Sequence, residues 1–285
     1  MKQNKQRIGL VLEGGSMRGM YTAGVLDVFL ESNIEADIVV GVSAGALFGV
    51  NYVSKQNGRT IRYNKKFNQD RHYLGIYPLL KEGNIVNTEY AYDRVPRLLD
   101  PFDNETFMNS DTSFYATVTN VETGNAEYKQ VKDVFKDMDS LRASGSLPFV
   151  SKPVKIDNSS YLDGSISDSV PYEWLYSQGV DKMIVVLTRD MDYQKKPMSE
   201  ILIKTFMRKY PKIQERLINR HREYNSSINK LKIYEAAGKA FVIRPSQKLL
   251  ISKLERDPDK LENVYRLGRS DASDILDRLR EYLKK

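Results

Sequence analysis

The stretch "GVSAGAL", residues 41–47, follows the apolar run "DIVV" and decides the fold. Ser43 lies between Gly41 and Gly45 in the pattern G-x-S-x-G. Between a strand and a helix of an α/β sheet, this pattern forms a sharp turn that lifts a serine hydroxyl clear of the backbone. It therefore predicts a buried strand over residues 37–42, an elbow at Ser43 and a helix after it. A tight turn whose small residues serve only packing is the alternative interpretation.

The residues before this elbow show the same order of elements. Residues 7–12, "RIGLVL", are typical of a short strand buried on both faces, and a glycine loop follows them. Apolar residues then recur at helical spacing over residues 20–31. Strand, helix, strand and helix within roughly 50 residues predict an α/β protein whose parallel sheet carries helices on both faces.

The rest of the chain adds further elements to this pattern. Residues 56–110 are rich in aromatic and polar residues and fit no regular element, so we expect an irregular segment, either a cap over the substrate or a surface excursion. Pro211 is expected to kink or divide a long helix over residues 199–236. The remaining predictions are a hairpin over 113–131, a short helix from Asp139 that stops before Pro148, a helix from about Pro171, strands over 182–188 and 240–245, and a helix over 258–283.

The glycine loop "EGGSMRG", residues 13–19, precedes the first helix, where backbone N–H groups bind anions. A dinucleotide fingerprint needs glycine at position 16, which is Ser16, and a P-loop needs a terminal Gly-Lys-Ser/Thr, which is absent. An oxyanion hole needs only free N–H donors near a nucleophile, and Gly14, Gly15 and Ser16 can supply them. Arg18 adds positive charge or braces the loop.

A serine hydroxyl needs a base to take its proton, and the usual histidine is scarce in this chain. His72 lies in the irregular segment. His221 follows the chain order serine, acid, histidine, but its neighbours Arg220 and Arg222 disfavour the imidazolium that catalysis would create. A carboxylate is the other candidate, because Asp163 begins the tight turn "DGS" after a short apolar strand and can accept a proton if it is partly buried. An Asp-Gly turn without chemistry explains the same residues.

The composition excludes several kinds of chemistry. The 285 residues contain no cysteine and two histidines, which excludes disulfides, thiolate sites and a histidine metal cluster. No acidic loop has the spacing of a hard-cation site, so we expect no metal and no cofactor. The first apolar run, residues 8–12, is too short for a signal peptide, and no run reaches the length of a membrane span.

The net charge of +7 is unevenly distributed along the chain. Residues 201–285 hold 21 basic against 11 acidic residues, whereas residues 1–200 hold 23 against 26. A basic region of this kind can attract an anionic surface, either a membrane or a nucleic acid, but a solvated set of helices is the simpler interpretation. The chain has no motif that reads nucleic acid, so we expect no nucleic-acid partner and leave open a peripheral membrane contact through this basic region.

Four segments, in this order, resemble motifs of the patatin-like phospholipases. "EGGSMRG" is similar to that family's glycine-rich oxyanion motif G-G-G-x-R-G, and "GVSAGA" is similar to its G-x-S-x-G elbow. "ASGSLPF", residues 143–149, resembles its A-S-x-A-x-P block, and "DGS", residues 163–165, resembles its D-G-G/A motif. The resemblance covers about residues 8–190, including "DKMIVVLTR" at residues 181–189.

This resemblance implies a three-layer α/β/α fold with a mostly parallel central sheet. It also implies a Ser-Asp dyad without histidine, in which Ser43 is the nucleophile and Asp163 the base. The oxyanion loop implied by the resemblance consists of Gly14, Gly15, Ser16, Arg18 and Gly19.

Two residues depart from the family pattern. Glu13 replaces the first glycine of the loop, and Ser165 replaces the usual Gly or Ala of the dyad motif. Both leave the catalytic groups in place, so they bear on substrate and rate. The chain resembles a bacterial branch of the family, with a catalytic domain over residues 8–190 and a basic, mainly helical C-terminal extension over residues 191–285 packed on it.

Together these features predict a cytoplasmic serine esterase, a lipid acyl hydrolase of the phospholipase A type that acts on a lipid or another acyl ester. A non-catalytic lipid- or acyl-binding module on the same fold is the alternative. The intact Ser43, Asp163 and glycine loop favour the enzyme.

Overall fold

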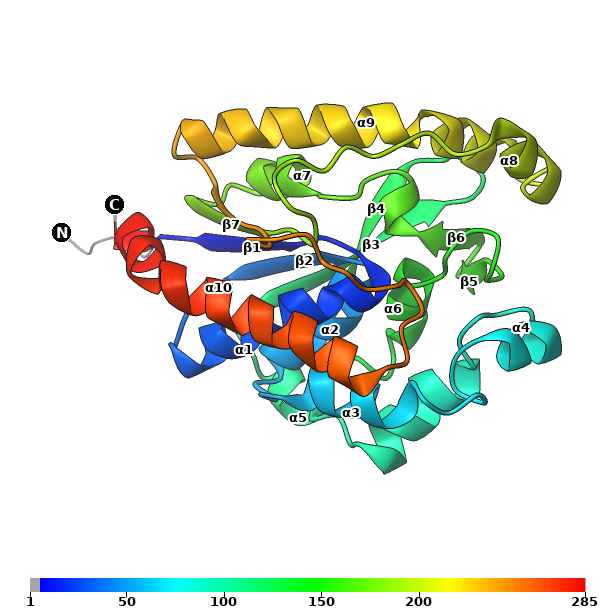
Figure 1. Ribbon diagram of the computed structural model, residues 1–285, viewed down its shortest axis with the longest axis horizontal. Helices are drawn as coiled ribbons and strands as arrows, with labels where there is room; N and C mark the ends of the chain where they lie inside the picture. The colour runs from blue at the N-terminus through cyan, green and yellow to red at the C-terminus, as the bar shows by residue number, and fades with distance from the viewer. Residues whose placement is uncertain (1–5, 285) are drawn as a thin grey trace.

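The computed structural model describes residues 6–284, and within that range an eight-stranded sheet lies between two layers of helices (Figure 1). The strands are β1 Ile8–Leu12, β2 Ile38–Val42, β3 Ser113–Asn120, β4 Ala126–Val131, β5 Val154–Ile156, β6 Ser159–Asp163, β7 Lys182–Val186 and β8 Phe241–Ile243. Strands β3, β2, β1, β7 and β8 lie side by side in that order and run parallel. The predicted three-layer α/β/α fold with a mostly parallel sheet is confirmed.

Strand β3 pairs with three other strands, β2, β4 and β6. β4 pairs antiparallel with β3 along residues 114–119 and so occupies one edge of it. β2 and β6 therefore share the opposite edge, β2 beside residues 113–117 and β6 beside residues 118–120. Because β2 runs parallel to β3 and β6 runs antiparallel to it, the carboxyl ends of β2 and β6 meet.

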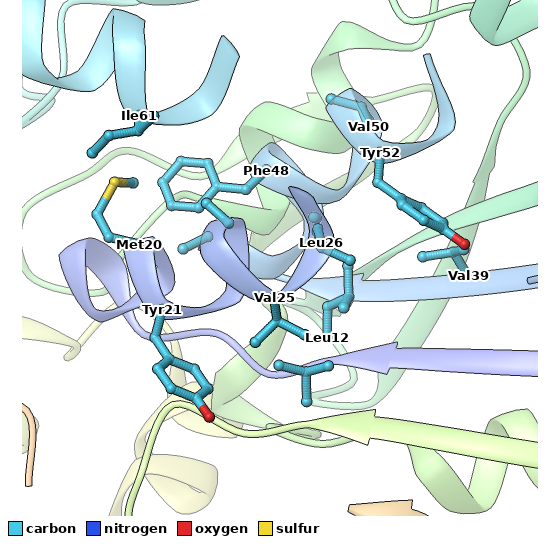
Figure 2. Packing of buried hydrophobic residues seen from close by; sticks show 14 of the residues in the cluster. Leu12, Met20, Tyr21, Val25, Leu26, Val39, Phe48, Val50, Tyr52 and Ile61 are labelled. Atoms are coloured by element: carbon cyan, nitrogen blue, oxygen red, sulfur yellow. The ribbon is translucent and has the colours of Figure 1, made fainter. Parts of the chain in front are cut away.

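Helices cover both faces of the inner strands, which explains their unbroken apolar sequences. The helices α1 (Gly19–Glu31), α2 (Ala44–Val53) and α10 (Pro258–Lys284) form one layer, and α7 (Tyr172–Ser177) and α9 (Pro211–Ala236) form the other (Figure 1). Neighbouring side chains of β1 pack on opposite faces of the sheet. Leu12 packs with apolar residues of α1 and α2, whereas Val11 packs with those of α7 and α9. Figure 2 shows Val25 and Leu26 of α1 converging on Leu12.

The prediction of an irregular segment over residues 56–110 is wrong, because most of it is helical. The helices are α3 Arg59–Phe67, α4 Ile76–Glu82, a π-type helix Tyr90–Leu99 and α5 Asn104–Met108. These helices are short and polar, and a buried ion pair that no periodicity reveals helps to fix them. Arg59, 4% exposed, lies 3.2 Å from the carboxylate of Asp100 and also donates to Asn51.

The other predicted elements are present with small differences at their ends. β3 and β4 form the predicted hairpin, and α6 (Met138–Ser144) and α7 are the predicted short helices. Pro211 divides the predicted long helix into α8 (Glu200–Phe206) and α9, and it occupies the first turn of α9, where its missing N–H is not needed. Across residues 6–284 we find no helix with both the length and the apolar character that crossing a bilayer requires.

Helices α1 and α10 cross in unusually close contact, and two glycines permit it. A Cβ atom on Gly24 of α1 would meet the carbonyl oxygen of Tyr265, and a Cβ atom on Gly268 of α10 would meet that of Tyr21. The two backbones therefore touch reciprocally. Each contact requires a residue without a side chain.

We expect the substitution Gly268→Ala to destabilise the fold by roughly 1–3 kcal/mol, because the new methyl group would force the helices apart. Helix propensity alone predicts the opposite sign, a gain of about 1 kcal/mol. Urea unfolding measures the difference, with Ser270→Ala at an exposed position of α10 as the control. A Gly268→Ala variant as stable as wild type would show that the helices do not touch in this way.

Candidate active site

The elbow places Ser43 at the carboxyl end of β2, where the chain turns into α2. Its backbone is strained, with φ 54° and ψ −121°, a conformation that costs an L-residue on the order of 1–3 kcal/mol. Two close contacts explain the flanking glycines. A Cβ atom on Gly41 would lie 2.6 Å from the Cα of Ala46, and one on Gly45 would meet the carbonyl oxygen of Leu12.

Asp163 reaches this elbow through the register of the sheet. Val42, the last residue of β2, pairs with Thr117, and Asp163, the last residue of β6, pairs with the next residue along β3, Val118. The strands that carry Ser43 and Asp163 thus end head to head on one edge of β3. Gly164 makes the following turn possible, because a Cβ atom there would meet the carbonyl oxygen of Thr117.

The Asp163 carboxylate is fully buried and incompletely hydrogen-bonded. Its Oδ1 accepts a 2.8 Å hydrogen bond from the backbone N–H of Ser165, whereas Oδ2 has no partner of good geometry within residues 6–284. Burial raises the pKa of this carboxyl above its usual value, and interactions with the hydroxyls of Ser165 and Ser43 oppose that rise. An unpartnered carboxylate oxygen can accept a proton from a neighbouring hydroxyl.

The glycine loop lies directly against Ser43. A Cβ atom on Gly14 would lie 2.9 Å from the Cβ of Ser43, and one on Gly15 would lie 2.7 Å from Oγ1 of Thr188. The N–H groups of Gly14, Gly15 and Ser16 form no hydrogen bond with any described part of the chain. They are therefore available to a ligand. Of the other two predicted loop residues, Gly19 begins α1 and Arg18 ends the short 3₁₀ turn Ser16–Arg18.

Two cavities of opposite character meet at Ser43. The apolar cavity, of about 140 Å³, extends between α2 and the helices of residues 59–102; its apolar walls include Leu47, Phe48, Tyr63, Leu74, Val95 and Leu141. The cationic cavity, of about 190 Å³, lies on the side of α9; its charged walls are Glu13, Arg18, Arg189, Lys195, Lys196, Arg220 and Lys253. Residues 59–102 thus line the apolar cavity on one side of Ser43.

Neither histidine contacts the serine. Nδ1 of His72 lies 3.0 Å from Asp70 at the surface, and Nδ1 of His221 lies 3.1 Å from the carbonyl oxygen of Ile218. Among the described residues, no hydrogen bond joins either ring to Ser43 or Asp163. His221 does line the cationic cavity, but the strand register brings only Asp163 to the elbow.

The two departures from the family pattern, Glu13 and Ser165, are both bound by helix α9. The Glu13 carboxylate is buried and accepts 2.6 Å and 2.8 Å hydrogen bonds from the N–H of Thr188 and the hydroxyl of Tyr224. Arg220 donates to the carbonyl oxygen of Ser165 at 2.5 Å and to its hydroxyl at 2.7 Å. Since residues 220 and 224 are one helical turn apart, the same face of α9 binds both Glu13 and Ser165.

Sequence reasoning missed these α9 residues as part of the site. Their spacing of four places them on one helix face, but many surface helices show such pairs. The signal that could have found them was the coincidence of two unusual polar residues, Glu13 and Ser165, at positions where the motifs favour small ones. Each requires a polar partner from elsewhere in the chain.

An α/β/α fold with a serine at a strained strand-to-helix elbow, and a loop of free N–H groups beside it, defines the class of nucleophile-elbow proteins. The family model described as patatin-like phospholipase matches residues 10–176, more than half of the chain. The chain therefore belongs to the patatin-like phospholipase family. A second family model, described as a domain of unknown function (DUF6363), matches residues 210–284.

Individual relatives match a part of this chain. The uncharacterized protein YjjU of Escherichia coli is 29% identical over 188 residues, which cover 64% of this chain and 52% of that protein. Lysophospholipase nte1 of Emericella nidulans is 28% identical over 192 residues, 65% of this chain and 12% of that protein. The chain thus spans about half the length of the first and a small part of the second. The crystal structure of VipD from Legionella pneumophila aligns over 96% of this chain and 67% of its own with a TM-score of 0.48 and 12% identity.

We expect Glu13→Ala to lower the free energy of unfolding by roughly 1–3 kcal/mol, because it leaves the buried N–H of Thr188 without an acceptor. Glu13→Gln keeps an oxygen acceptor and should cost less. Urea unfolding compares both with Glu223→Ala, which removes an exposed carboxylate of α9 and should change stability by less than about 1 kcal/mol. Equal effects of Glu13→Ala and Glu223→Ala would mean that Glu13 does not hold α9 to the sheet.

Proposed function

We propose that this chain is a serine-dependent lipid acyl hydrolase in which Ser43 attacks the ester carbonyl and Asp163 takes the serine proton. The observation that carries the proposal is the buried carboxylate of Asp163, whose Oδ2 lacks a partner within residues 6–284 and whose strand ends opposite the elbow. The family membership and the relative named a lysophospholipase support lipid esters as the substrate class.

The proposed reaction proceeds in two halves. Oγ of Ser43 attacks the carbonyl carbon as its proton passes to Oδ2 of Asp163, and the tetrahedral oxyanion is held by the N–H groups of Gly14, Gly15 and Ser16. Collapse of this intermediate expels the alcohol, which takes the proton from Asp163. Water then attacks the acyl-serine and loses a proton to Asp163. Collapse of the second tetrahedral intermediate releases the fatty acid, and Oγ of Ser43 takes the proton from Asp163, which restores both groups.

Burial makes this aspartate better suited to the role. A carboxylate whose pKa is raised is a stronger base than an ordinary surface aspartate, provided that it is still ionised at the working pH. The Ser43 backbone is fixed as well, since its N–H donates a 2.8 Å hydrogen bond to Oγ of Ser144.

The proposal includes a catalytic unit over residues 8–190 and an extension over residues 191–285, and the separate family matches at 10–176 and 210–284 support this division.

Labelling by a fluorophosphonate probe and hydrolysis of a nitrophenyl ester test the dyad. We expect wild type and the exposed-serine control Ser177→Ala to be labelled, Ser43→Ala to be unlabelled, and Asp163→Asn to lose roughly 10²–10⁴-fold in kcat/KM. Because burial disfavours the charged carboxylate, Asp163→Asn should be at least as stable as wild type at neutral pH. Labelling that persists in Ser43→Ala would exclude the dyad; lipid binding by an unlabelled wild type would instead identify a binding module.

The pH profile gives an independent test of Asp163. Because only the ionised carboxylate accepts a proton and its pKa is raised, kcat/KM should fall with decreasing pH at values above those at which an ordinary aspartate titrates, about 4. Ser165→Ala removes a hydroxyl that lowers this pKa, so its acidic limb should move to higher pH. An acidic limb that does not move in Ser165→Ala would argue for a different titrating group.

A further inference from the structure

The cationic cavity beside Ser43 holds far more positive than negative charge. Three arginines and three lysines line it: Arg18, Arg189, Lys195 and Arg220 are partly buried, and Lys196 and Lys253 are exposed. The sole acid among its described lining residues is Glu13. Both carboxylate oxygens of Glu13 already accept hydrogen bonds from Thr188 and Tyr224.

Two carboxylates, Asp163 near Arg220 and Glu13 near Arg18 and Lys195, attract these cations without forming an ion pair with them. Among residues 6–284, none of the six side chains takes part in an ion pair. Aromatic rings accompany two of them instead: the ammonium of Lys195 lies 4.2 Å from the ring centre of Tyr224, and the guanidinium of Arg189 lies 3.9 Å from that of Tyr193. Arg220 donates to Ser165, which is uncharged.

Crowding of like charges in a partly buried space is costly unless an anion joins them. Burial, with the charge of Arg220 adding to its effect, lowers the pKa of Lys195 to about 7. Burial also lowers the pKa of Arg18, with Arg189 adding to the effect. A doubly ionised or singly ionised phosphate would relieve this repulsion and accept several charge-assisted hydrogen bonds.

The position of the cavity shows which part of a substrate would enter it. The apolar and cationic cavities share Ser16, Ser43, Leu147 and Lys253, so one ligand can extend through both past the nucleophile. An acyl chain suits the apolar cavity. With the ester carbonyl at Ser43, the alcohol portion then points into the cationic cavity.

We propose that the cationic cavity binds a phosphate on the alcohol side of the scissile ester, so that the preferred substrate is an acyl ester whose head group is a phosphate without a neighbouring cation. Of the six cations that line the cavity, all but Arg18 lie outside residues 10–176, the part that matches the patatin-like model. The segment after residue 176 thus supplies the selectivity. This inference rests on the proposed function.

Three esters with the same acyl chain test the selectivity: a lysophosphatidylglycerol, a lysophosphatidylcholine and a monoacylglycerol. We expect wild type to show the highest kcat/KM for the lysophosphatidylglycerol, by about tenfold or more over the monoacylglycerol. Lys195→Gln and Arg189→Gln should each lower this ratio severalfold. Lys209→Gln removes the same charge from an exposed position outside the cavity and should leave the ratio unchanged. A wild-type ratio near one, or a ratio unaffected by both cavity variants, would overturn the proposal.

A binding measurement separates this inference from the proposed reaction. Dodecyl phosphate has no ester carbonyl to cleave, so calorimetry of its binding does not depend on catalysis. We expect it to bind at least tenfold more tightly than inorganic phosphate and to lose affinity in Lys195→Gln but not in Lys209→Gln. If dodecyl phosphate binds in this way to a wild-type protein that cleaves no ester, the proposed hydrolase function would be wrong and the proposed anion site would still be supported. Equal binding of inorganic phosphate would show an anion site independent of the acyl cavity and refute the inference.

Discussion

The site depends on how three strands, β2, β4 and β6, pair with the two edges of β3. β4 covers one side of β3, and this forces β2 and β6 to follow each other along the other side. Two residues far apart in the chain, Ser43 and Asp163, are therefore fixed by backbone hydrogen bonds rather than by flexible side-chain contacts. A register shift of one residue in β6 would turn the Asp163 side chain to the opposite face of the sheet. The geometry of the proposed dyad is thus a property of the sheet.

Helix α9 packs against the site at the two positions where this chain departs from the family motifs. Tyr224 and Arg220 bind Glu13 and Ser165, the two residues that differ from the family motifs. Without α9, Glu13 would be a buried carboxylate short of a donor, and burying such a group is costly. Glu13, Ser165 and α9 therefore form one set of contacts. These contacts leave the N–H groups of the glycine loop free and bring Arg220 to the wall of the cationic cavity.

Much of this structure could be predicted from the sequence, and the reasons for the failures are physical. Apolar runs such as residues 8–12 and 37–42 predicted the inner strands because both faces of each are buried. The helices of residues 59–108 were missed because they are short and their buried faces mix apolar with polar residues. In α3, for example, Ile61 and Phe67 are buried together with Arg59, which pairs with Asp100. The motifs selected Ser43, Asp163 and the glycine loop. They could not reveal Lys195 or Arg220, whose role depends on where α9 and the loop before it pack.

The close crossing of α1 and α10 has a consequence for biosynthesis. A ribosome adding 5–20 residues per second needs roughly ten seconds or longer between the end of α1 and the end of α10. During this interval the groove around Gly24, and the apolar residues of α1 that α10 later covers, remain open to solvent or to other chains. Nascent chains that have not yet formed α10 are therefore the state in which this protein is most exposed to aggregation and has most need of a chaperone.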